Sequence, residues 1–232
     1  LKKSKNKFDI LTTFYKNPIS IKNVRSFQYS FPNDLNNLRE LLEKEKPDVL
    51  VNTMGYSNID FCELNKSDAE MLHVEVTEKI CKICENISTK QIFLSSDYVF
   101  DGEKGNYSED DVPNPVNYYG LSKLKAEQLI LKNPINTIIR TSVIYDWDYR
   151  ARFFNSVIKN LQNNQEINAT TDVYNSVTFL DNLVESIFKV ITLNQNGIFH
   201  VVDSTCVNRF EFAEIIAKIF QLDKNLIKTV SV

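Results

Sequence analysis

Runs of consecutive apolar residues alternate along the chain with segments in which apolar residues recur every three or four positions. The first pattern is typical of buried strands, and the second is typical of amphipathic helices. The strands predicted in this way are 8–15, 48–52, 92–94, 137–145 and 200–202. The predicted helices are 35–46, 68–86, 124–131 with a start near Tyr118, 152–161 and 180–191. Strands that alternate with helices predict a parallel sheet with helices on both faces.

A candidate for catalysis lies where the strand at 92–94 ends. The strand leads into Ser95 and Ser96, a loop rich in Gly, Pro, Asn and Asp follows, and Tyr119 and Lys123 come next. Because Tyr119 and Lys123 are four residues apart, they share one face if a helix begins there. A nearby ammonium lowers the pKa of a phenol, which is ordinarily about 10. With a serine hydroxyl on a substrate carbonyl, such a pair can protonate the oxygen as hydride reaches its carbon.

An isolated Tyr-x-x-x-Lys pair is more often an aromatic that packs inward and a solvated lysine, so the surrounding motifs decide its meaning. The stretches SSDYVFDGEKGNY (95–107) and EDDVPNPVNYYGLSKLKAE (109–127) resemble the dTDP-4-dehydrorhamnose reductases closely. This family belongs to the extended branch of the short-chain dehydrogenase/reductase superfamily. Its members carry a Ser/Thr-Thr/Ser-Asp-Tyr-Val-Phe-Asp-Gly strand end, an Asn-Pro-x-Asn-x-Tyr-Gly loop and a Lys four residues after the Tyr. The resemblance covers most of the chain, from residue 33 to residue 222.

The resemblance implies three catalytic residues. Ser96 would bind the carbonyl oxygen, Tyr119 would donate the proton, and Lys123 would contact the ribose and tune the pKa of the phenol. Ser95 is the neighbouring rival of Ser96, but the family places the catalytic hydroxyl just before the Asp. Tyr118 is the rival of Tyr119, but the residue four positions after it is a serine rather than a lysine.

The resemblance also implies a Rossmann-type doubly wound parallel sheet with a small C-terminal substrate lobe. We expect an NAD(P)-binding domain at 1–145 and the substrate lobe at 146–232. The implied reaction is reduction of the C4 ketone of dTDP-4-dehydro-L-rhamnose to dTDP-L-rhamnose by NAD(P)H. The expected cofactor-binding residues are Asn52, Thr53, Met54, Gly55, Ser95, Tyr119, Lys123 and Ser142. The expected substrate-binding residues are Ser96, Asp97, Val143 and Trp147.

Several positions depart from the family pattern. The family's Gly-x-x-Gly-x-x-Gly turn, which holds a pyrophosphate at a helix N-terminus, is absent, and we expect the first strand and this turn to be missing from the chain. His73 stands where the family has an Asn. Met54 stands in a turn whose small residues let the backbone pass beside the cofactor. Val143 replaces a substrate-stacking Trp of bacterial members, and Trp147, the sole tryptophan, could substitute for it.

These departures leave two other functions open. One is a non-catalytic regulatory subunit, since the regulatory subunit of methionine adenosyltransferase resembles these reductases. The other is a sugar-nucleotide epimerase or dehydratase, since dehydratases carry a carboxylate beside the catalytic hydroxyl, where this chain has Asp97. For the cofactor, the strand at 8–15 ends without a carboxylate and is followed by Lys16, which favours NADP over NAD.

The bulk composition narrows the classes of partner. The chain has 232 residues, of which 43% are hydrophobic, and this is enough for a sizeable core. Its net charge is −3, so the composition gives no sign of a basic surface that would bind nucleic acid. No apolar run is long enough for a membrane span, and we expect no signal peptide and a cytoplasmic protein. Cys81 and Cys84 fall within a helical pattern without further ligands at zinc spacing, so we expect neither a metal nor a disulfide there. The expected partners are the nucleotide sugar and, if the chain self-associates, a second copy in a homodimer.

Overall fold

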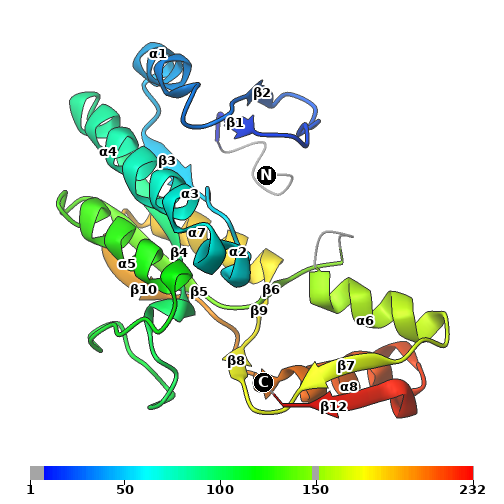
Figure 1. Cartoon of the computed structure of the whole chain (residues 1–232). Coiled ribbons are helices and arrows are strands. Elements are labelled where there is room, and N and C mark those ends of the chain that lie inside the picture. The colour runs from blue at the N-terminus through cyan, green and yellow to red at the C-terminus, as the bar shows by residue number, and fades with distance from the viewer. Residues whose placement is uncertain (1–7, 148–151, 232) are drawn as a thin grey trace. The chain divides into compact units, whose positions relative to one another are not determined.

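The computed structural model describes residues 8–147 and 152–231 (Figure 1). Its α-helices are α1 Leu35–Glu45, α2 Ile59–Leu64, α3 Lys66–Glu70, α4 Val76–Asn86, α5 Tyr118–Ile130, α6 Arg152–Gln162, α7 Leu180–Thr192 and α8 Arg209–Phe220. Its strands are β1 Leu11–Phe14, β2 Arg25–Gln28, β3 Val49–Asn52, β4 Lys90–Ser96, β5 Thr137–Thr141, β6 Ile144–Tyr145, β7 Ile167–Thr170, β8 Tyr174–Ser176, β9 Thr178–Phe179, β10 Gly197–His200, β11 Cys206–Asn208 and β12 Ile227–Val230. Short helical turns of other types are η2 Met71–Glu75 (π), η3 Asp97–Val99 and η4 Lys224–Leu226 (both 3₁₀).

The chain folds into two compact units and passes between them within β4. The first unit comprises the residues up to Phe93 together with Pro115–Asn136. The second comprises Leu94–Asn114 and the residues from Thr137 onward. These units follow the packing of the chain. The functional division into 1–145 and 146–232 stays a prediction.

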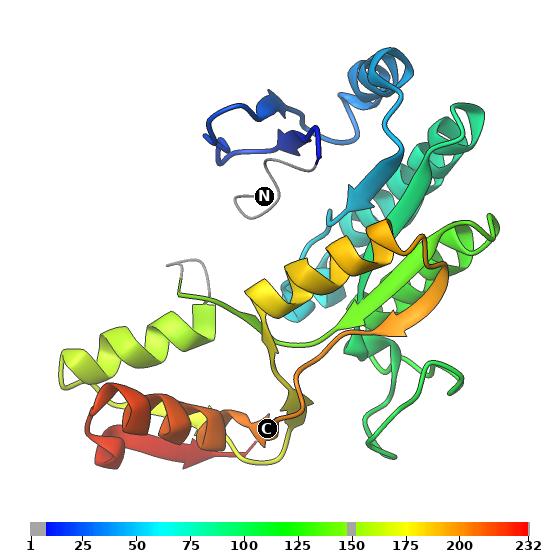
Figure 2. The ribbon, with the colours of Figure 1, turned by 180° about the vertical axis from the view of Figure 1, so that it is seen from behind.

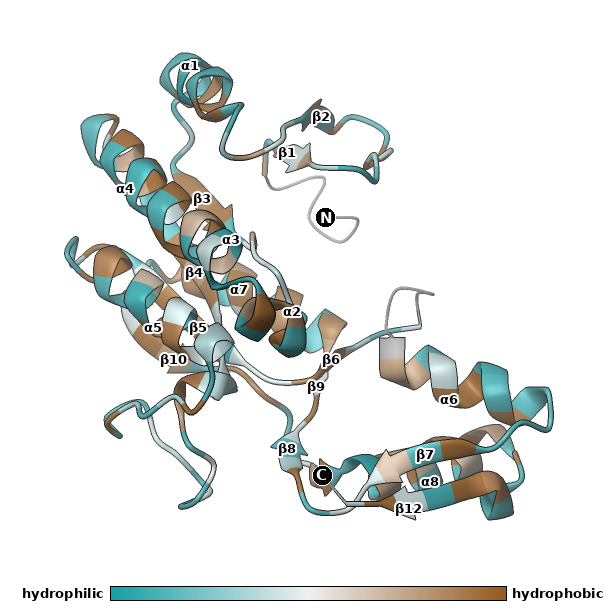
Figure 3. Ribbon diagram, viewed as in Figure 1, coloured by the Kyte–Doolittle hydropathy of each residue, from teal (hydrophilic) through white to brown (hydrophobic). Residues whose placement is uncertain are grey.

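In the first unit, β3 pairs with β4 in parallel, with Val49 opposite Lys90 and Asn52 opposite Phe93. Helices α1 and α4 pack together through a core of buried side chains: Leu38, Leu42, Val76, Ile80, Ile83 and Cys84. The alternating teal and brown along α4 in Figure 3 shows the amphipathic pattern that places this core on one side of the helix. The helix carries both Cys81 and Cys84, and burial raises the pKa of the Cys84 thiol to about 12.

The N-terminal part of the first unit differs from the prediction at one strand. The apolar run at 8–15 forms β1 as expected, but β1 pairs in parallel with β2, a strand that is not among those predicted from the sequence. The sequence of β2 is Arg-Ser-Phe-Gln, and its single apolar residue gives no strand pattern. This strand is therefore defined by its backbone pairing with β1 rather than by its side-chain pattern.

In the second unit, β10 pairs with β5 in parallel, with Ile198 opposite Ile138, and Figure 2 shows the two strands side by side. The order of the central sheet is β10-β5-β4-β3. A separate core lies among α6, α8, β7 and β12, which pairs with β7 in parallel. Its buried side chains are Phe154, Val157, Leu161, Ile167, Ala169, Val177, Phe212, Ala213, Ile216, Ala217 and Ile227.

The single strand predicted at 137–145 is wrong. Strand β5 ends at Thr141, and the last two residues form β6, which pairs with β9 instead. Between them Val143 adopts a φ of 40°, a left-handed backbone that a β-branched residue rarely takes. The sequence carries no signal of this break, because neither Gly nor Pro stands between Thr141 and Ile144.

None of the helices within the described residues is both long and apolar enough to cross a membrane.

Candidate active site

The start of α5 places the predicted catalytic pair. The side chain of Asn117 accepts a hydrogen bond from the backbone N–H of Gly120 (2.9 Å), so the helix begins at Tyr118. Tyr119 and Lys123 are therefore one turn apart on a real helix, as the sequence predicted.

Lys123 is a buried lysine. Its side chain is 4% exposed, and Nζ lies 4.0 Å from the centroid of the Phe93 ring on β4. Burial lowers the pKa of its ammonium to about 7, although Glu127 on the same helix acts in the opposite direction. A surface lysine, the alternative interpretation of the Tyr-x-x-x-Lys pattern, keeps its ordinary pKa. The environment of Lys123 is instead one that proteins build around functional lysines.

The rival phenol, Tyr118, is engaged elsewhere. Its hydroxyl donates to Glu70 Oε2 (2.7 Å), and Lys125 Nζ bonds both oxygens of the same carboxylate. Burial and the bond to Glu70 raise the pKa of Tyr118 to about 12. A phenol held in this way is a poorer acid than an ordinary tyrosine. The choice of Tyr119 over Tyr118 stays a prediction, and Tyr118 is the phenol that is bound to a carboxylate.

His73 lies beside Tyr119, and the sequence did not foresee its arrangement. The predicted helix 68–86 is interrupted at η2, where one π-turn replaces an α-turn and His73 sits at its centre. The imidazole is 1% exposed, and its ring meets the Tyr119 ring edge-on at 5.9 Å between centroids. Burial, with a smaller effect from Lys123, lowers the pKa of His73 to about 4. The ring is therefore neutral near neutral pH.

Three groups fix the tautomer of this neutral ring. The backbone N–H of Tyr56 donates to His73 Nε2 (2.8 Å), which places the ring proton on Nδ1 because a backbone N–H can act only as a donor. Nδ1 then donates to Ser122 Oγ (2.7 Å). Ser122 in turn donates to the backbone carbonyl of Tyr119 (2.8 Å). A continuous chain of hydrogen bonds thus runs from the turn after β3 to the first turn of α5.

One member of this hydrogen-bond chain stands out in the sequence. His73 departs from the family pattern, whereas neither Ser122 nor Tyr56 does. Ser122 is fully buried, although its sequence position between Leu121 and Lys123 is that of an ordinary helical residue. A serine one residue before a buried lysine carries no pattern of its own, so its role becomes visible in the folded chain alone.

The turn after β3 holds four of the residues predicted to bind a cofactor. Asn52 ends the strand, its Oδ1 accepts from the backbone N–H of Met54 (3.1 Å), and its Nδ2 is buried without a partner among the described residues. A Cβ on Gly55 would lie 3.0 Å from His73 Nε2, so glycine is required for this close approach. The side chain of Met54 packs against the α1–α4 core, which removes it from the backbone edge where the family has a small residue. Thr53 is exposed in the same turn.

In the second unit, the end of β4 carries the predicted serines. Ser95 is 4% exposed, and its Oγ has no hydrogen-bond partner among the described residues. Ser96 Oγ contacts Asp97 Oδ1 (3.0 Å) and accepts from the backbone N–H of Tyr98 (3.3 Å). Asp97 Oδ2 accepts from Asn175 Nδ2 (3.0 Å) and makes a short hydrogen bond with Ser142 Oγ. Asp97 and Ser142, predicted to touch substrate and cofactor, thus bond each other.

The other predicted substrate residues follow the end of β5. The backbone carbonyl of Val143 accepts from Thr178 N–H (3.2 Å), which holds its left-handed conformation in place. Trp147 is 64% exposed, with its ring edge-on to Phe154 at 5.4 Å and near Phe220 at 5.9 Å. An exposed indole braced by other rings presents a face on which a planar ligand group can stack.

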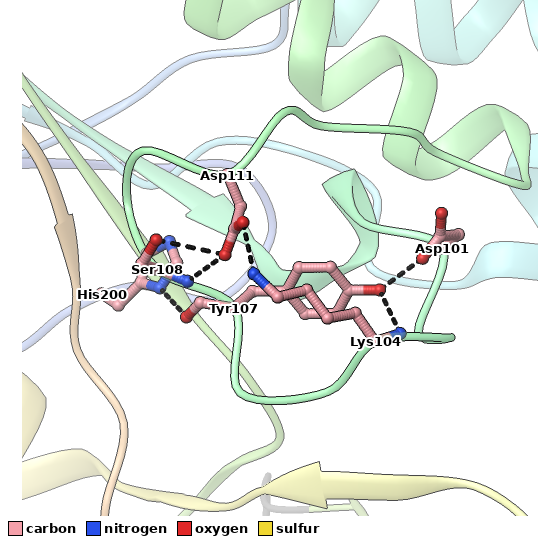
Figure 4. Close-up of polar contacts among 6 residues, drawn as sticks. All are labelled: Asp101, Lys104, Tyr107, Ser108, Asp111 and His200. Carbon is pink, nitrogen blue, oxygen red and sulfur yellow. Dashed lines mark hydrogen bonds and ion pairs between the residues drawn. The ribbon is translucent and has the colours of Figure 1, made fainter.

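The loop that joins β4 to α5 in sequence is internally tied within the second unit (Figure 4). Tyr107 makes a short hydrogen bond to Asp101 and stacks on Phe100 at 4.3 Å between centroids, and Ser108 donates to Asp111. His200 joins this loop, since its Nδ1 lies 3.1 Å from the Tyr107 carbonyl oxygen. His200 thus connects the end of β10 to this loop.

Two buried polar atoms with unused bonding capacity, Asn52 Nδ2 and Ser95 Oγ, lie at strand ends. Each belongs to the set that the sequence assigns to a cofactor. Buried polar groups are nearly always hydrogen-bonded, so an unpartnered donor at a strand end suits a polar ligand such as the amide or ribose of a nicotinamide cofactor. Each of the two strand ends, taken by itself, therefore fits a polar group of the implied cofactor. Among the described residues no group of acidic, histidine or cysteine side chains has the arrangement of a metal site.

Comparison with known proteins supports the same family. The chain is 31% identical over 186 residues to the spore coat polysaccharide biosynthesis protein SpsK of Bacillus subtilis, a match that spans 79% of this chain and 65% of that protein. It is 34% identical over 120 residues to the methionine adenosyltransferase 2 subunit beta of Xenopus tropicalis, which spans 51% of this chain and 36% of that protein. The chain thus covers about two thirds or less of the length of these relatives.

Solved structures agree on the fold. A hypothetical dTDP-4-dehydrorhamnose reductase from Sulfolobus tokodaii superposes with a TM-score of 0.89 at 31% identity, over 100% of this chain and 80% of that one. The dTDP-4-dehydrorhamnose reductase of Bacillus anthracis in complex with NADP gives a TM-score of 0.87 at 22% identity, over 96% and 84%. The predicted α/β fold with a parallel sheet is confirmed.

The family model that matches is described as the RmlD substrate binding domain, and the match extends over residues 21–232. It covers nearly the whole of the described chain, both units included. The motifs at 95–107 and 109–127 lie inside it. The chain belongs to the RmlD substrate binding domain family.

Proposed function

We propose that the protein reduces the C4 ketone of dTDP-4-dehydro-L-rhamnose to dTDP-L-rhamnose with NAD(P)H. The observation that carries this proposal is the Tyr119–Lys123 pair on α5, in which a buried lysine with a pKa of about 7 lies one turn from a phenol. Proteins similar to this chain include dTDP-4-dehydrorhamnose reductases, which supports the class of substrate.

The bound cofactor would supply the hydride, and the chain would manage the oxygen. Ser96 binds the carbonyl oxygen through its hydroxyl, and Tyr119 gives its proton as that oxygen becomes an alkoxide. The ammonium form of Lys123 favours the phenolate and so makes Tyr119 a stronger acid. The hydrogen-bond chain from Tyr56 through His73 and Ser122 keeps the first turn of α5 in place.

The remaining assignments concern binding. Asn52, Thr53, Met54, Gly55, Ser95 and Ser142 contact the cofactor together with Tyr119 and Lys123, while Ser96, Asp97, Val143 and Trp147 contact the sugar nucleotide. The partner is a nucleotide sugar, acted on in the cytoplasm, and a homodimer is the assembly we propose. NADP is preferred over NAD because Lys16 follows β1 at the position where an NAD-selective carboxylate would stand.

The test is steady-state oxidation of NADPH by the full-length protein with dTDP-4-dehydrorhamnose, alongside the same assay with NADH. We expect turnover with the keto-sugar nucleotide and none without it. Identification of the product as dTDP-rhamnose distinguishes a reductase from an epimerase or dehydratase, which would return a different sugar without net oxidation of NADPH. Absence of turnover on every 4-keto nucleotide sugar would refute the proposal.

A second function is favoured by one observation, the 34% identity to a methionine adenosyltransferase 2 subunit beta. In this alternative the protein binds a methionine adenosyltransferase catalytic subunit and changes its kinetics. Size-exclusion chromatography of the two purified proteins together, with the adenosyltransferase assay on the complex, tests it. Co-elution with altered kinetics and no NADPH oxidation would replace the reductase proposal.

A further inference from the structure

Asp97 is the acidic residue next to the predicted catalytic serine, and its two oxygens have different surroundings. Oδ2 accepts from Asn175 Nδ2 (3.0 Å) on β8 and makes a short hydrogen bond with Ser142 Oγ just after β5. Oδ1 contacts Ser96 Oγ (3.0 Å). All four residues lie within the second unit. Oδ2 thus receives two side-chain hydrogen bonds, while the contact of Oδ1 is with the hydroxyl that the mechanism uses: Ser96 donates in it when Asp97 is ionised, and Asp97 can donate in it when protonated.

The proton of Ser96 has two competing destinations. A serine hydroxyl has one proton to donate. The backbone N–H of Tyr98 already donates to Ser96 Oγ (3.3 Å), so Asp97 decides where the proton of Ser96 points. An ionised Asp97 can act only as an acceptor and would take that proton, which would leave Ser96 unable to donate to a carbonyl oxygen. A protonated Asp97 can instead donate to Ser96 Oγ and leave the serine proton for the substrate.

We propose that Asp97 carries a proton on Oδ1 in the folded protein, donates it to Ser96 Oγ, and thereby directs the Ser96 hydroxyl toward the substrate carbonyl. This inference rests on the proposed function in its role for Ser96. It assigns Asp97 as a positioning residue in place of the substrate contact predicted from sequence. Asn175, which the sequence did not single out, and Ser142 fix which oxygen of Asp97 bears the proton.

Burial of the carboxyl raises the pKa of Asp97, while the hydrogen bonds from Ser142 and Asn175, and the one from Ser96 when Ser96 is the donor, act in the opposite direction. The charged and titratable groups that act around it are Arg209, at the start of α8, and Tyr98. The guanidinium of Arg209 stacks on the Phe153 ring at 4.9 Å, and burial lowers its pKa, with Tyr98 and Asp97 opposing that change. Arg209 favours the ionised form of Asp97, while the exclusion of water favours the protonated form.

The protonation state can be measured without substrate. In full-length protein labelled with ¹³C at aspartate carboxyls, the Asp97 signal is identified by its loss in Asp97→Asn. We expect this carboxyl to stay protonated at pH values at which the exposed aspartates have already ionised. A signal that titrates with the exposed aspartates would overturn the proposal, whether or not the protein is a reductase.

The direction of the bond to Ser96 has its own test, because the two arrangements predict opposite signs. If Asp97 donates to Ser96, then Ser96→Ala removes an acceptor from the protonated form and lowers the pKa of Asp97. If Ser96 donates to an ionised Asp97, the same substitution raises that pKa. We expect the pKa to fall by at least about half a unit. A rise overturns the proposal, and thermal melting of Ser96→Ala confirms that the variant is folded.

Activity supplies the third measurement. Asn at position 97 keeps an N–H donor for Ser96 and a carbonyl acceptor for Ser142, so Asp97→Asn should keep kcat within about tenfold, whereas Asp97→Ala should lower it by about 10²-fold or more. Equal and large losses in both variants overturn the proposal, because they show that the carboxylate charge is what matters. If the wild-type protein reduces no nucleotide sugar, the proposed function fails, and the two pKa measurements still decide the state of Asp97.

Discussion

His73 Nδ1 lies 2.7 Å from Ser122 Oγ, and this hydrogen bond joins the π-turn η2 to the first turn of the helix that carries Tyr119 and Lys123. The opposite nitrogen of the same ring accepts from the backbone of Tyr56. A protonated imidazole has two donors and no acceptor, so it cannot keep the Tyr56 bond. The arrangement therefore requires a neutral ring, which agrees with the lowered pKa of about 4.

The first prediction concerns stability in acid. The pKa of His73 is about 4 in the folded protein and about 6.5 in the unfolded chain, so between these values the unfolded chain binds more protons. Stability then rises with pH across this window and is lost as pH falls through it. We expect wild type to lose about 2 kcal/mol between about pH 7 and about pH 5 through this group.

The measurement is urea unfolding at several pH values, compared with His73→Asn. The variant lacks the titrating group and keeps a side-chain amide, so its free energy of unfolding should change less across the same window. Identical pH dependence in the two proteins would show that His73 does not titrate with a lowered pKa.

The second prediction uses the close approach of Gly55. A Cβ at this position would lie 3.0 Å from His73 Nε2 and 3.2 Å from Cδ2, so Gly55→Ala must displace the ring. We expect a loss of about 1–3 kcal/mol in the free energy of unfolding. In a His73→Ala background the same change should cost less, with a coupling of about 0.5–3 kcal/mol. Additive effects in this double-mutant cycle would mean that the ring does not restrict position 55.

The helix that carries the catalytic pair could be predicted from sequence because its signals are local. Asn117 caps it, and the spacing of Tyr119 and Lys123 matches one helical turn. The bond between His73 and Ser122 could not be predicted, because His73 lies in a π-turn. Such a turn changes the direction of the side chains that follow it by one residue, and the sequence pattern of 68–86 is read as one continuous α-helix.

The same limit applies in the second unit. The break at Val143 has no sequence signal, since neither Gly nor Pro separates strands β5 and β6. The short bond between Ser142 and Asp97 joins residues 45 positions apart. Sequence patterns report local periodicity, whereas these contacts are set by how distant segments pack.

The third prediction concerns the buried Lys123. Its pKa is about 7 in the folded protein and about 10.5 in the unfolded chain, so the unfolded chain binds more protons between these values. Stability should rise with pH from about 7 toward about 10.5. Lys123→Met, which fills the same space without charge, should raise the free energy of unfolding at neutral pH by more than about 1 kcal/mol and lower reductase turnover.

The matched control is Lys125→Met on the same helix, whose ammonium pairs with Glu70 at the surface. Its removal should change the free energy of unfolding by about 1 kcal/mol or less. If Lys123→Met lowers the free energy of unfolding, then the buried ammonium does not destabilise the folded protein, which contradicts the lowered pKa of Lys123.

The last prediction separates Tyr119 from its neighbour. Tyr119→Phe removes the phenol oxygen and leaves the ring that meets His73 edge-on at 5.9 Å, so the fold and the affinity for NADPH should be retained. The oxygen donates its proton as the carbonyl becomes an alkoxide, so its contribution is largely confined to the transition state. Turnover should fall by about 10²–10⁴-fold.

Tyr118→Phe is the control, because its hydroxyl is bound to Glu70 and serves the packing of α5 rather than the reaction. This variant should lose some stability, by about 1 kcal/mol, and keep turnover within a few-fold. NADPH oxidation with dTDP-4-dehydrorhamnose and fluorescence titration of NADPH measure the two effects separately. Near wild-type turnover in Tyr119→Phe would show that Tyr119 is not the proton donor. A large loss of turnover in Tyr118→Phe alone would assign that role to Tyr118, although Tyr119 is the tyrosine that lies one helical turn from Lys123.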